Sequence, residues 1–414
     1  MTAAPAPDAA QVIAALVKTH AGLDLPVRLR LWDGSEAGPA GGPVLVIKTP
    51  RALQRIGWRP GELGLARAYI SGDLEVEGDL TEGLRQALGT RPRVSPARWA
   101  PAAWAGIKAA AQLKILGPPP PPPACELHVR GRLHSRARDR AVIAGHYDVT
   151  AAFYQLILDP SMAYSCAWWD TATPLPNSQG LAGAQRAKLE LICGKLKLQP
   201  GDRLLDVGCG WGSLTVHAAR DHQARVTAVT LSREQGGYVR QRLRGLGLQD
   251  RAEVRIQDYR DTAGGPYDAI ASVEMGEHVG AAGYPAFCAA LHRLLRPGGR
   301  LLIQQMSRGG RAPGGGPFIE SYIAPDMHMR PVGETVALIE AAGFEVIDVQ
   351  AMREHYVTTI RAWLDNFEQN LPAITALLTP EQVRVWRLYL AGGALSFEDG
   401  RMGVDQILAV RADR

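Results

Sequence analysis

Apolar and polar positions alternate with two different periods along the second half of the chain. Short apolar runs rich in Val, Ile and Leu are typical of buried strands. Between them lie segments whose apolar positions recur every three or four residues, which predicts helices. The predicted strands cover residues 203–208, 225–231, 252–259, 267–273, 300–306 and 345–352, and the helices cover residues 184–198, 213 onward, 233–247, 284–299 and 332–344.

Strands that alternate with helices predict an α/β protein with a doubly wound, parallel sheet. A Pro-Gly-Gly sequence marks the end of the predicted helix at residues 284–299. The tail after Arg361 has mostly helical character, and no internal repeat is visible.

The N-terminal part of the chain differs from this pattern. Residues 43–50 predict a strand, and residues 61–80 predict a helix, a turn and an extended segment, so we expect a smaller α+β domain. Gly117 is followed by six consecutive prolines, residues 118–123, and this stretch forms a semi-rigid spacer. We therefore divide the chain into a smaller N-terminal domain (1–116), a Pro-rich and Arg-rich linker (117–145) and a larger C-terminal domain (146–414).

Charge and composition restrict the class of partner. The hydrophobic fraction of 46% is enough for a buried core, and the net charge of +5 suits an anionic partner. The arginine-rich segment at residues 128–140 is either a solvated connector or an attachment to anionic lipid headgroups. We expect no nucleic acid partner, because no nucleic-acid-binding module accompanies that segment.

Two further absences favour a cytoplasmic, membrane-peripheral protein. The N-terminus lacks the pattern of a signal peptide, and no apolar run reaches the ~20 residues of a spanning helix. Five cysteines are scattered and odd in number, which favours a reducing compartment. Their spacing predicts no metal site.

The sequence LLDVGCGWGSL (residues 204–214) carries the clearest chemical signal. An apolar strand ends at Asp206, and glycines follow at every second position, Gly208, Gly210 and Gly212. Such a turn lies at the carboxyl edge of the sheet, where ligands bind in open α/β folds. The lysine of a phosphate loop is missing and the glycine spacing differs from the dinucleotide pattern, so a nucleoside without phosphates fits better.

This turn resembles the first motif of class I S-adenosylmethionine-dependent methyltransferases. The resemblance implies a Rossmann-like sheet, with the glycine turn facing the methionine part of the cofactor and Asp206 at its polar end. Many such enzymes end the second strand in an acidic residue that binds the ribose. Four other residues stand in that place here, Thr230, Leu231, Ser232 and Gln235. The hydroxyl and amide groups among their side chains can make similar hydrogen bonds.

Longer motifs narrow the resemblance. Residues 146–169, 184–212, 229–235, 257–261 and 274–280 are similar, in this order, to cyclopropane-fatty-acyl-phospholipid synthases and mycolic acid methyltransferases. The resemblance covers His146 to the C-terminus and implies a helical lid over the sheet. It also implies methyl transfer from S-adenosylmethionine to a cis double bond in an unsaturated phospholipid at the membrane surface.

The same resemblance implies the site residues. A bicarbonate or carbonate ion would remove a proton after methyl transfer, near Cys166, Glu277, His278 and Tyr356. The cofactor would contact Tyr164 and Ser165 from the lid, with Asp258 and Tyr259 near the adenine and Glu274 in the same group. Two of the histidines have an equal structural interpretation: His146 as a helix cap and His278 as a supporting residue.

One departure bears on the product. Gln304 stands where cyclopropane synthases usually carry a histidine, and Gln305 stands where a threonine is usual. An amide cannot carry a positive charge, so an anionic base would be held less firmly. This favours proton loss from an adjacent chain carbon, an exo-methylene product and a partner reductase, over closure of a cyclopropane ring.

Two other functions fit parts of the sequence. A small-molecule N- or O-methyltransferase would need neither the basic segment nor an apolar tunnel. A non-catalytic lipid-binding protein would not need Glu277, Cys166 and the glycine turn together. The oligomeric state stays open, although a homodimer would double the membrane contact.

Overall fold

The computed structural model describes residues 8–89, 99–113, 115–127, 131, 133–134, 138, 150–169, 180–309 and 314–412. The chain forms two compact units, residues 1–126 with 378–395, and residues 127–377 with 396–414. These boundaries differ from the expected ones, because the proline stretch belongs to the first unit and so does a helical segment near the C-terminus. Most of the arginine-rich segment, and His146, lie outside the described residues.

The first unit has the predicted α+β character. Its four-stranded sheet has the order β2-β1-β3-β4, with β1 and β3 parallel and the outer pairs antiparallel. The strand predicted at residues 43–50 is β3, and the predicted helix, turn and extended segment are α3 and β4. The elements are α1 (Ala9–Ala21), β1 (Arg28–Leu31), β2 (Glu36–Ala37), β3 (Val44–Ile47), α2 (Pro50–Trp58), α3 (Glu62–Ile70), β4 (Leu74–Glu77), α4 (Leu80–Gly89) and α5 (Trp99–Gln112).

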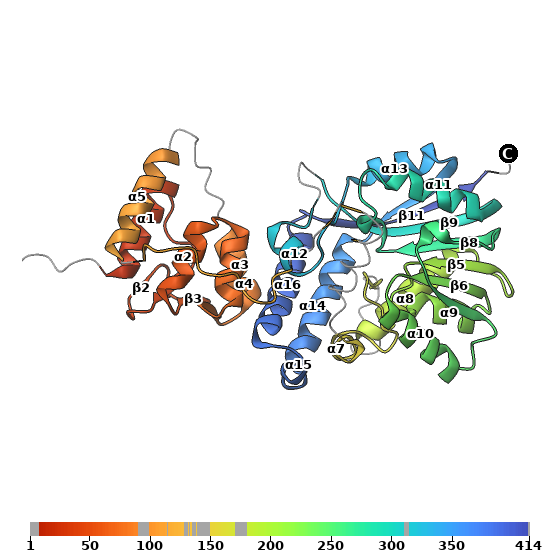
Figure 1. Ribbon diagram of the computed structural model, residues 1–414, viewed down its shortest axis with the longest axis horizontal. Helices are drawn as coiled ribbons and strands as arrows, with labels where there is room; N and C mark the ends of the chain where they lie inside the picture. Colours follow the sequence, from red (N-terminus) through yellow and green to blue (C-terminus); the bar gives the residue numbers. More distant parts are fainter. Residues whose placement is uncertain are drawn as a thin grey trace, which may run out of the picture. The chain divides into compact units, whose positions relative to one another are not determined.

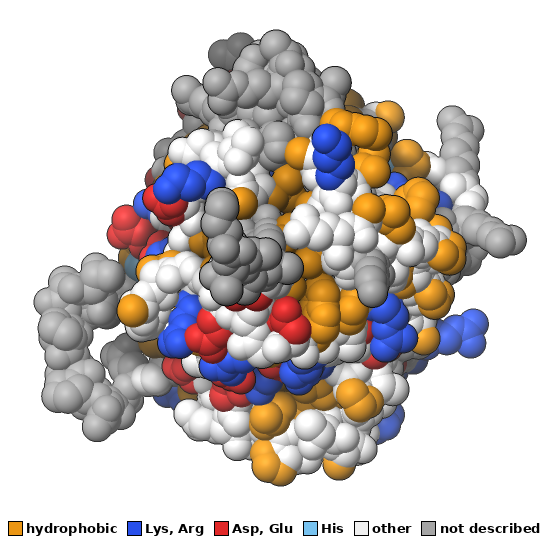
Figure 2. Space-filling model, turned by 90° about the vertical axis from the view of Figure 1, so that its left-hand side faces the viewer, with side chains coloured by type: hydrophobic (Ala, Val, Ile, Leu, Met, Phe, Trp, Pro, Cys, Tyr) orange, Lys and Arg blue, Asp and Glu red, His pale blue; other side chains and the backbone are white. Residues whose placement is uncertain are grey.

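A buried arginine anchors the proline stretch within this unit. Arg55 donates from Nε to Asp73 Oδ2 at 3.0 Å and from Nη1 to the carbonyl of Pro121 at 2.6 Å. Large apolar side chains nevertheless remain on the surface, and Trp58 and Trp104 are 56% and 60% exposed. Figure 2 shows a face of the molecule on which hydrophobic side chains are exposed between basic and acidic ones.

The second unit contains a seven-stranded sheet of order β10-β11-β9-β8-β5-β6-β7. The strands β9, β8, β5, β6 and β7 run parallel, as the alternation of elements predicts. The strands are β5 (Arg203–Val207), β6 (Arg225–Thr230), β7 (Ala252–Ile256), β8 (Tyr267–Val273), β9 (Leu295–Ser307), β10 (Phe344–Ala351) and β11 (Gly403–Arg411).

Helices cover both faces of this sheet (Figure 1). Neighbouring residues of β5 show why: Leu204 packs in the apolar cluster of one face and Leu205 in that of the other. The first face holds α8 (Gly180–Leu196), α9 (Ser213–Asp221) and α10 (Arg233–Gly245), and the second holds α11 (Tyr284–Leu294) and α13 (Val332–Ala341).

The expectation of a mostly helical tail is wrong at its end. Helices α14 (Arg353–Gln369), α15 (Leu371–Leu377) and α16 (Pro380–Glu398) are followed by β11, which inserts between β9 and β10 and pairs antiparallel with both. Its own residues do not reveal that place, because the pairing partners are distant in sequence. Helices α14 and α15 pack against α7 (Ala151–Ile157). The stretch that follows α7, residues 158–169, carries Tyr164, Ser165 and Cys166 and is called the lid segment below.

No helix within the described ranges combines the length and hydrophobicity that a membrane span requires.

Candidate active site

The three glycines of the turn after β5 have different roles. A Cβ on Gly208 would lie 2.7 Å from Met275 Cγ, and one on Gly212 would lie 2.8 Å from Val239 Cγ1. Both glycines are therefore needed for packing. Gly210, with φ +51°, would meet nothing within 4 Å, so it faces open space at the edge of the sheet. A ligand can approach the backbone closely at that point.

Asp206 is fixed beside this turn. It is buried, and its Oδ2 accepts a hydrogen bond of 2.7 Å from Thr215 Oγ1 at the start of α9. Burial raises the pKa of the carboxyl to about 6, and the hydrogen bond from Thr215 and the charge of Lys188 oppose that rise. A cationic amine brought to this carboxylate would favour the ionised form further.

The residues after β6 cap helix α10. Ser232 Oγ accepts a hydrogen bond of 3.2 Å from the amide of Gln235, and Thr230 Oγ1 donates to Gln235 Oε1 at 2.9 Å. Leu231 is half-buried between them. These bonds hold the polar groups in one place at the edge of the sheet, where the resemblance puts the ribose.

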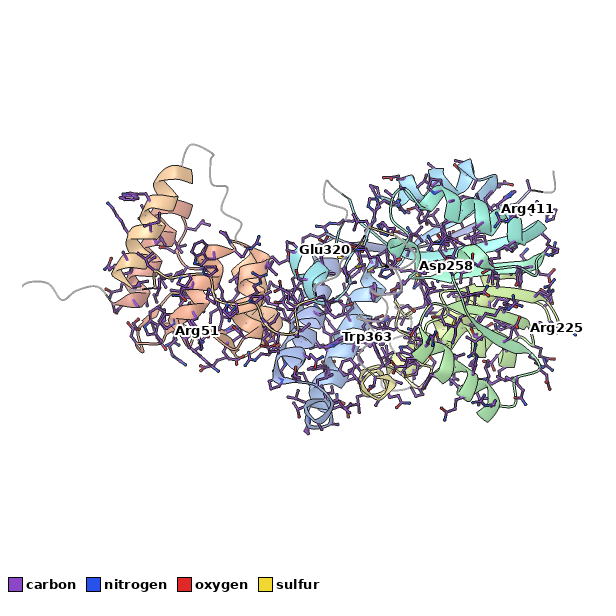
Figure 3. All side chains as sticks on the ribbon, viewed as in Figure 1. Arg51, Arg225, Asp258, Glu320, Trp363 and Arg411 are labelled. Atoms are coloured by element: carbon purple, nitrogen blue, oxygen red, sulfur yellow. The ribbon has the colours of Figure 1, made fainter. Side chains whose placement is uncertain are left out.

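The segment after β7 forms a short turn (Tyr259–Asp261). Asp258, labelled in Figure 3, caps it by accepting a hydrogen bond of 2.9 Å from the amide of Arg260 and pairs with the guanidinium of Arg260. Tyr259 packs edge-on against Phe287 at a centroid distance of 5.2 Å. The acid is therefore tied to the turn, and the role predicted for both residues at the adenine stays a prediction.

A buried lysine that the sequence reasoning missed positions the lid segment. Lys188 on α8 donates to Ser165 Oγ at 2.7 Å, and Gln185 donates to the carbonyl of Ser165 at 2.8 Å. Burial lowers the pKa of Lys188. The neighbouring Tyr164 ring lies 5.2 Å from the rings of both Tyr154 and Trp363, so aromatic side chains enclose this part of the site.

Glu274 lies at the centre of the residues predicted for the ion site. Its Oε1 accepts hydrogen bonds from the amide of Cys166 at 2.8 Å and from Gln304 Nε2 at 2.9 Å. Its Oε2 accepts one of 2.6 Å from the hydroxyl of Tyr356. The resemblance places Glu274 with the cofactor-binding residues, whereas its carboxylate contacts Cys166, Gln304 and Tyr356.

The backbone of Glu274 is held in an unusual conformation. Its φ of +50° lies in the left-handed region, which costs a residue with a Cβ about 1–2 kcal/mol. Strain of this kind is concentrated at functional sites. The side chain is half-buried, whereas Cys166 and Gln304 are fully buried, so Glu274 presents accessible surface.

Burial affects the ionisation of this cluster. It raises the pKa of Glu274, while the hydrogen bonds from Tyr356, Cys166 and Gln304 oppose that rise. Burial also raises the pKa of the Cys166 thiol, which donates to the carbonyls of Ala167 and Met352. Cys166 therefore stays a neutral thiol, and its amide rather than its sulfur contacts the carboxylate.

Glu277 and His278 lie next to each other in a short turn (Gly276–His278), but one side chain is buried and the other is exposed. Glu277 is fully buried, and neither of its carboxylate oxygens has a hydrogen-bond partner among the described residues. Burial, followed by repulsion from Glu274, raises its pKa to about 8. We therefore expect a neutral Glu277 beside an ionised Glu274. His278 is exposed on the other side of the turn.

Residues from distant elements support this centre, and no local motif announces them. Gln406 on β11 donates to Gln304 Oε1 at 3.0 Å and so fixes which end of the Gln304 amide faces Glu274. Thr359 on α14 accepts hydrogen bonds from the amide of Ala167 and from Trp169 Nε1. Gln305 is occupied elsewhere, since it accepts a hydrogen bond of 2.6 Å from the hydroxyl of Tyr284.

These features fit S-adenosylmethionine. Open space over Gly210 admits a ligand against the backbone, and Asp206 offers a carboxylate for its amino group. Glu274 is half-buried as a residue, and the ring of its partner Tyr356 lies 5.9 Å from the ring of Trp363. The arrangement can therefore bind a cationic nucleoside and accept a proton in a site shielded from water.

Comparisons with known proteins agree with this assignment. Residues 134–407 match the mycolic acid cyclopropane synthetase family. A probable fatty acid methyltransferase of Pseudomonas putida is 37% identical over 94% of this chain and 93% of its own length. A tuberculostearic acid methyltransferase of Mycobacterium tuberculosis is 33% identical over 94% of this chain and 88% of its own length.

The fold matches solved structures of the same group. A crystal structure of a mycolic acid cyclopropane synthase complexed with SAH and CTAB superposes with a TM-score of 0.61 at 31% identity. The match covers 66% of this chain and 98% of that protein. The predicted class I methyltransferase fold and its cofactor are thereby confirmed.

Proposed function

The chain belongs to the mycolic acid cyclopropane synthetase family of S-adenosylmethionine-dependent lipid methyltransferases, and on that basis we propose that it converts an unsaturated phospholipid acyl chain to a methylene-branched one. The observation that carries this proposal is the position of Glu274. Cys166, Gln304 and Tyr356, which the resemblance assigned to a bicarbonate site, bind its carboxylate. The base is then part of the chain rather than a bound ion.

When bound, S-adenosylmethionine supplies an electrophilic methyl group. Gly210 and Asp206 hold the donor at the sheet edge, and the rings of Tyr164 and Trp363 keep water from the acyl chain. An alkene is a weak nucleophile, so a fixed approach geometry in a dry site is required. Methylation of one alkene carbon leaves a cation on the other.

Glu274 then accepts the proton that neutralises this cation. Loss from the adjacent chain carbon, as first expected, would leave an internal alkene. An exo-methylene group instead requires a hydride shift that moves the cation to the methyl-bearing carbon, followed by proton loss from the methyl group. Direct loss of a methyl proton to the original cation would close a cyclopropane ring. The names of two relatives that match 94% of this chain, both methyltransferases of fatty acids, support the branched product.

Lipid product analysis tests the proposal. Purified protein is incubated with S-adenosylmethionine and vesicles of dioleoyl phospholipids, and the fatty esters are examined by proton NMR. We expect vinylidene protons in the wild type and a strong loss of product in Glu274→Gln. Upfield ring protons as the sole product would contradict the methylene proposal.

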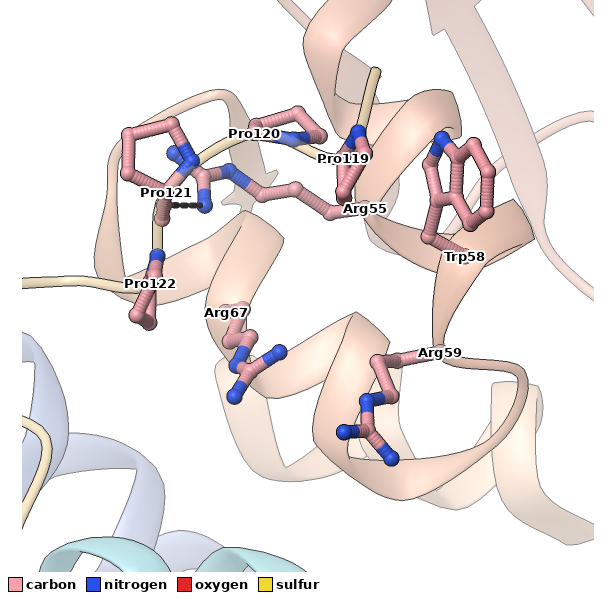
Figure 4. A pocket seen from close by; sticks show the side chains of 8 residues that line it. All are labelled: Arg55, Trp58, Arg59, Arg67, Pro119, Pro120, Pro121 and Pro122. Carbon is pink, nitrogen blue, oxygen red and sulfur yellow. Dashed lines mark hydrogen bonds between the residues drawn. The ribbon is translucent and has the colours of Figure 1, made fainter. Parts of the chain in front are cut away.

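We further propose that the first unit attaches the enzyme to an anionic membrane surface at the cytoplasmic face. It exposes Trp58 beside a pocket of about 440 Å³ that is lined by prolines and arginines (Figure 4). Arg55 and Arg67 are engaged with Asp73 and Glu126, but Arg59 is exposed and pairs with none of the described residues. An exposed tryptophan with an available arginine suits the interface between headgroups and acyl chains.

Vesicle sedimentation tests this attachment. Trp58→Ala and Arg59→Gln should each reduce binding to vesicles that contain phosphatidylglycerol, and added salt should weaken wild-type binding. Unchanged binding of both variants would contradict a role for this surface.

A methylene product would require a partner reductase to become a saturated methyl branch. A homodimer would strengthen attachment by doubling the contact.

A further inference from the structure

Helices α8 and α9 bring together four side chains that the active site does not use. One ligand atom each of Cys193, His217 and His222 lies within 4.8 Å of the other two. Glu190 joins them, because its Oε2 lies 3.2 Å from His217 Nε2 and 3.1 Å from His222 Nε2. Three side chains therefore meet between the two helices, and the carboxylate of Glu190 lies beside the two histidines.

The spacing suits a tetrahedral metal ion. With metal–nitrogen and metal–oxygen bonds of about 2.0–2.1 Å, neighbouring ligand atoms stand about 3.3 Å apart. The two contacts of Glu190 already have nearly this separation. Sulfur–nitrogen edges are about 3.6 Å with a metal–sulfur bond of about 2.3 Å, so the sulfur of Cys193, now within 4.8 Å of a ring nitrogen of each histidine, has to move toward them by at most about 1.2 Å.

A second carboxylate orients one of the histidines. His217 Nδ1 lies 2.8 Å from Asp221 Oδ2 one turn further along α9. Histidines that bind metals usually donate their other ring N–H to a carboxylate in this way. His217 Nε2, on the other side of the ring, faces the oxygen of Glu190 at 3.2 Å. A cation placed between this nitrogen and the carboxylate would replace their contact with two metal–ligand bonds.

We propose that Cys193, His217, His222 and Glu190 form a structural site for zinc or a similar transition-metal ion. Four protein ligands leave no open position, which is typical of structural rather than catalytic sites. Binding would release the Cys193 thiol proton to solvent, with no change of oxidation state.

Such an ion would tie α8 to α9. Both helices also reach the active site, α8 through Lys188 and α9 through Thr215. No local pattern announces the site, because residues 190 and 193 are far from residues 217 and 222 along the chain. The proposal is independent of the lipid chemistry, so its failure would leave the proposed function untouched.

Cobalt binding to the untagged, full-length protein tests the proposal after treatment with a chelator. We expect one Co²⁺ per chain, with the absorption of a tetrahedral site and a thiolate charge-transfer band. Cys193→Ser should lose that band, whereas Cys288→Ser, which alters another buried cysteine, should keep it. Zn²⁺ should compete for the same site and raise the melting temperature of the wild type.

Surface variants keep the test independent of folding. His222→Ala and Glu190→Gln change partly or largely exposed side chains, and each should abolish the tetrahedral spectrum. Asp221→Asn should weaken cobalt binding about 10–100-fold, as loss of an orienting carboxylate does elsewhere. His292→Ala, on α11, is the matched control and should bind as the wild type. No cobalt uptake, binding without a thiolate band, or an unaffected His222→Ala would each overturn the proposal.

Discussion

Replacement of Glu274 by glycine should exchange a built-in base for a bound one. The variant removes a carboxylate that accepts three hydrogen bonds, from Cys166, Gln304 and Tyr356. It leaves these three donors around a space that a small planar anion can occupy. Glycine also adopts the left-handed backbone at φ +50° without strain.

The expected magnitudes follow from these contacts. Loss of a positioned general base should lower kcat about 10²–10⁴-fold. Each hydrogen bond to a charged acceptor is worth about 1.5–3 kcal/mol, whereas relief of the backbone returns about 1–2 kcal/mol. We therefore expect a net loss of stability of a few kcal/mol, which an anion in the vacated space should largely restore.

The assay is methyl transfer to dioleoyl phospholipid vesicles, with and without added bicarbonate. Bicarbonate should raise both the activity and the melting temperature of Glu274→Gly and should leave the wild type unchanged. Glu274→Gln is the matched control: it should be equally slow, but not rescued, because its side chain fills the space. Wild-type activity in Glu274→Gln, or equal stimulation of the wild type by bicarbonate, would refute the assignment of Glu274 as the base.

Three further predictions concern ionisation and the glycine turn. The hydrogen bond from the Tyr356 hydroxyl favours the ionised form of Glu274, so Tyr356→Phe should raise the pKa of Glu274. The acid limb of the pH–kcat profile should then move to higher pH. An unmoved limb would argue that Glu274 is not the titrating base. The pKa of Glu277 rises from 4.5 to about 8 on folding, so about 5 kcal/mol of folding stability is lost as the pH rises through that range. Glu277→Gln should therefore raise the melting temperature at about pH 9 and raise it much less at about pH 4. Equal effects at both pH values would contradict a neutral Glu277. Gly210→Ala and Gly212→Ala share the backbone cost of a positive φ, but only the new Cβ at position 212 would also clash with Val239. Gly210→Ala should therefore mainly weaken SAH binding measured by calorimetry, and Gly212→Ala should mainly lower the melting temperature. The reverse pattern would remove Gly210 from the cofactor site.

The order of the elements was available from the sequence because it depends on local patterns. Apolar runs of strand length, the Asp-x-Gly-x-Gly-x-Gly turn and the helices between them depend on the neighbours of each residue along the chain. They predicted the parallel strands and the edge at which Asp206 and Gly210 lie. The resemblance to the family, carried by longer motifs, supplied the assignment of Cys166 and Tyr356 to the ion site and marked Gln304 as a departure from the family pattern.

Tertiary structure decided what those residues contact. Glu274 follows β8, but its three donors come from the lid segment, β9 and α14, and no local pattern reports such a meeting. The same holds for β11, whose insertion brings Gln406 to Gln304, and for Cys193, which becomes a candidate ligand when α9 packs against α8. The sequence by itself determined the alternating strands and helices between residues 184 and 352 and the place of the glycine turn after the first of those strands, because both depend on residues close together in the chain. The identity of the base and the candidate metal site depend on side chains more than 20 residues apart, and folding alone brings these together.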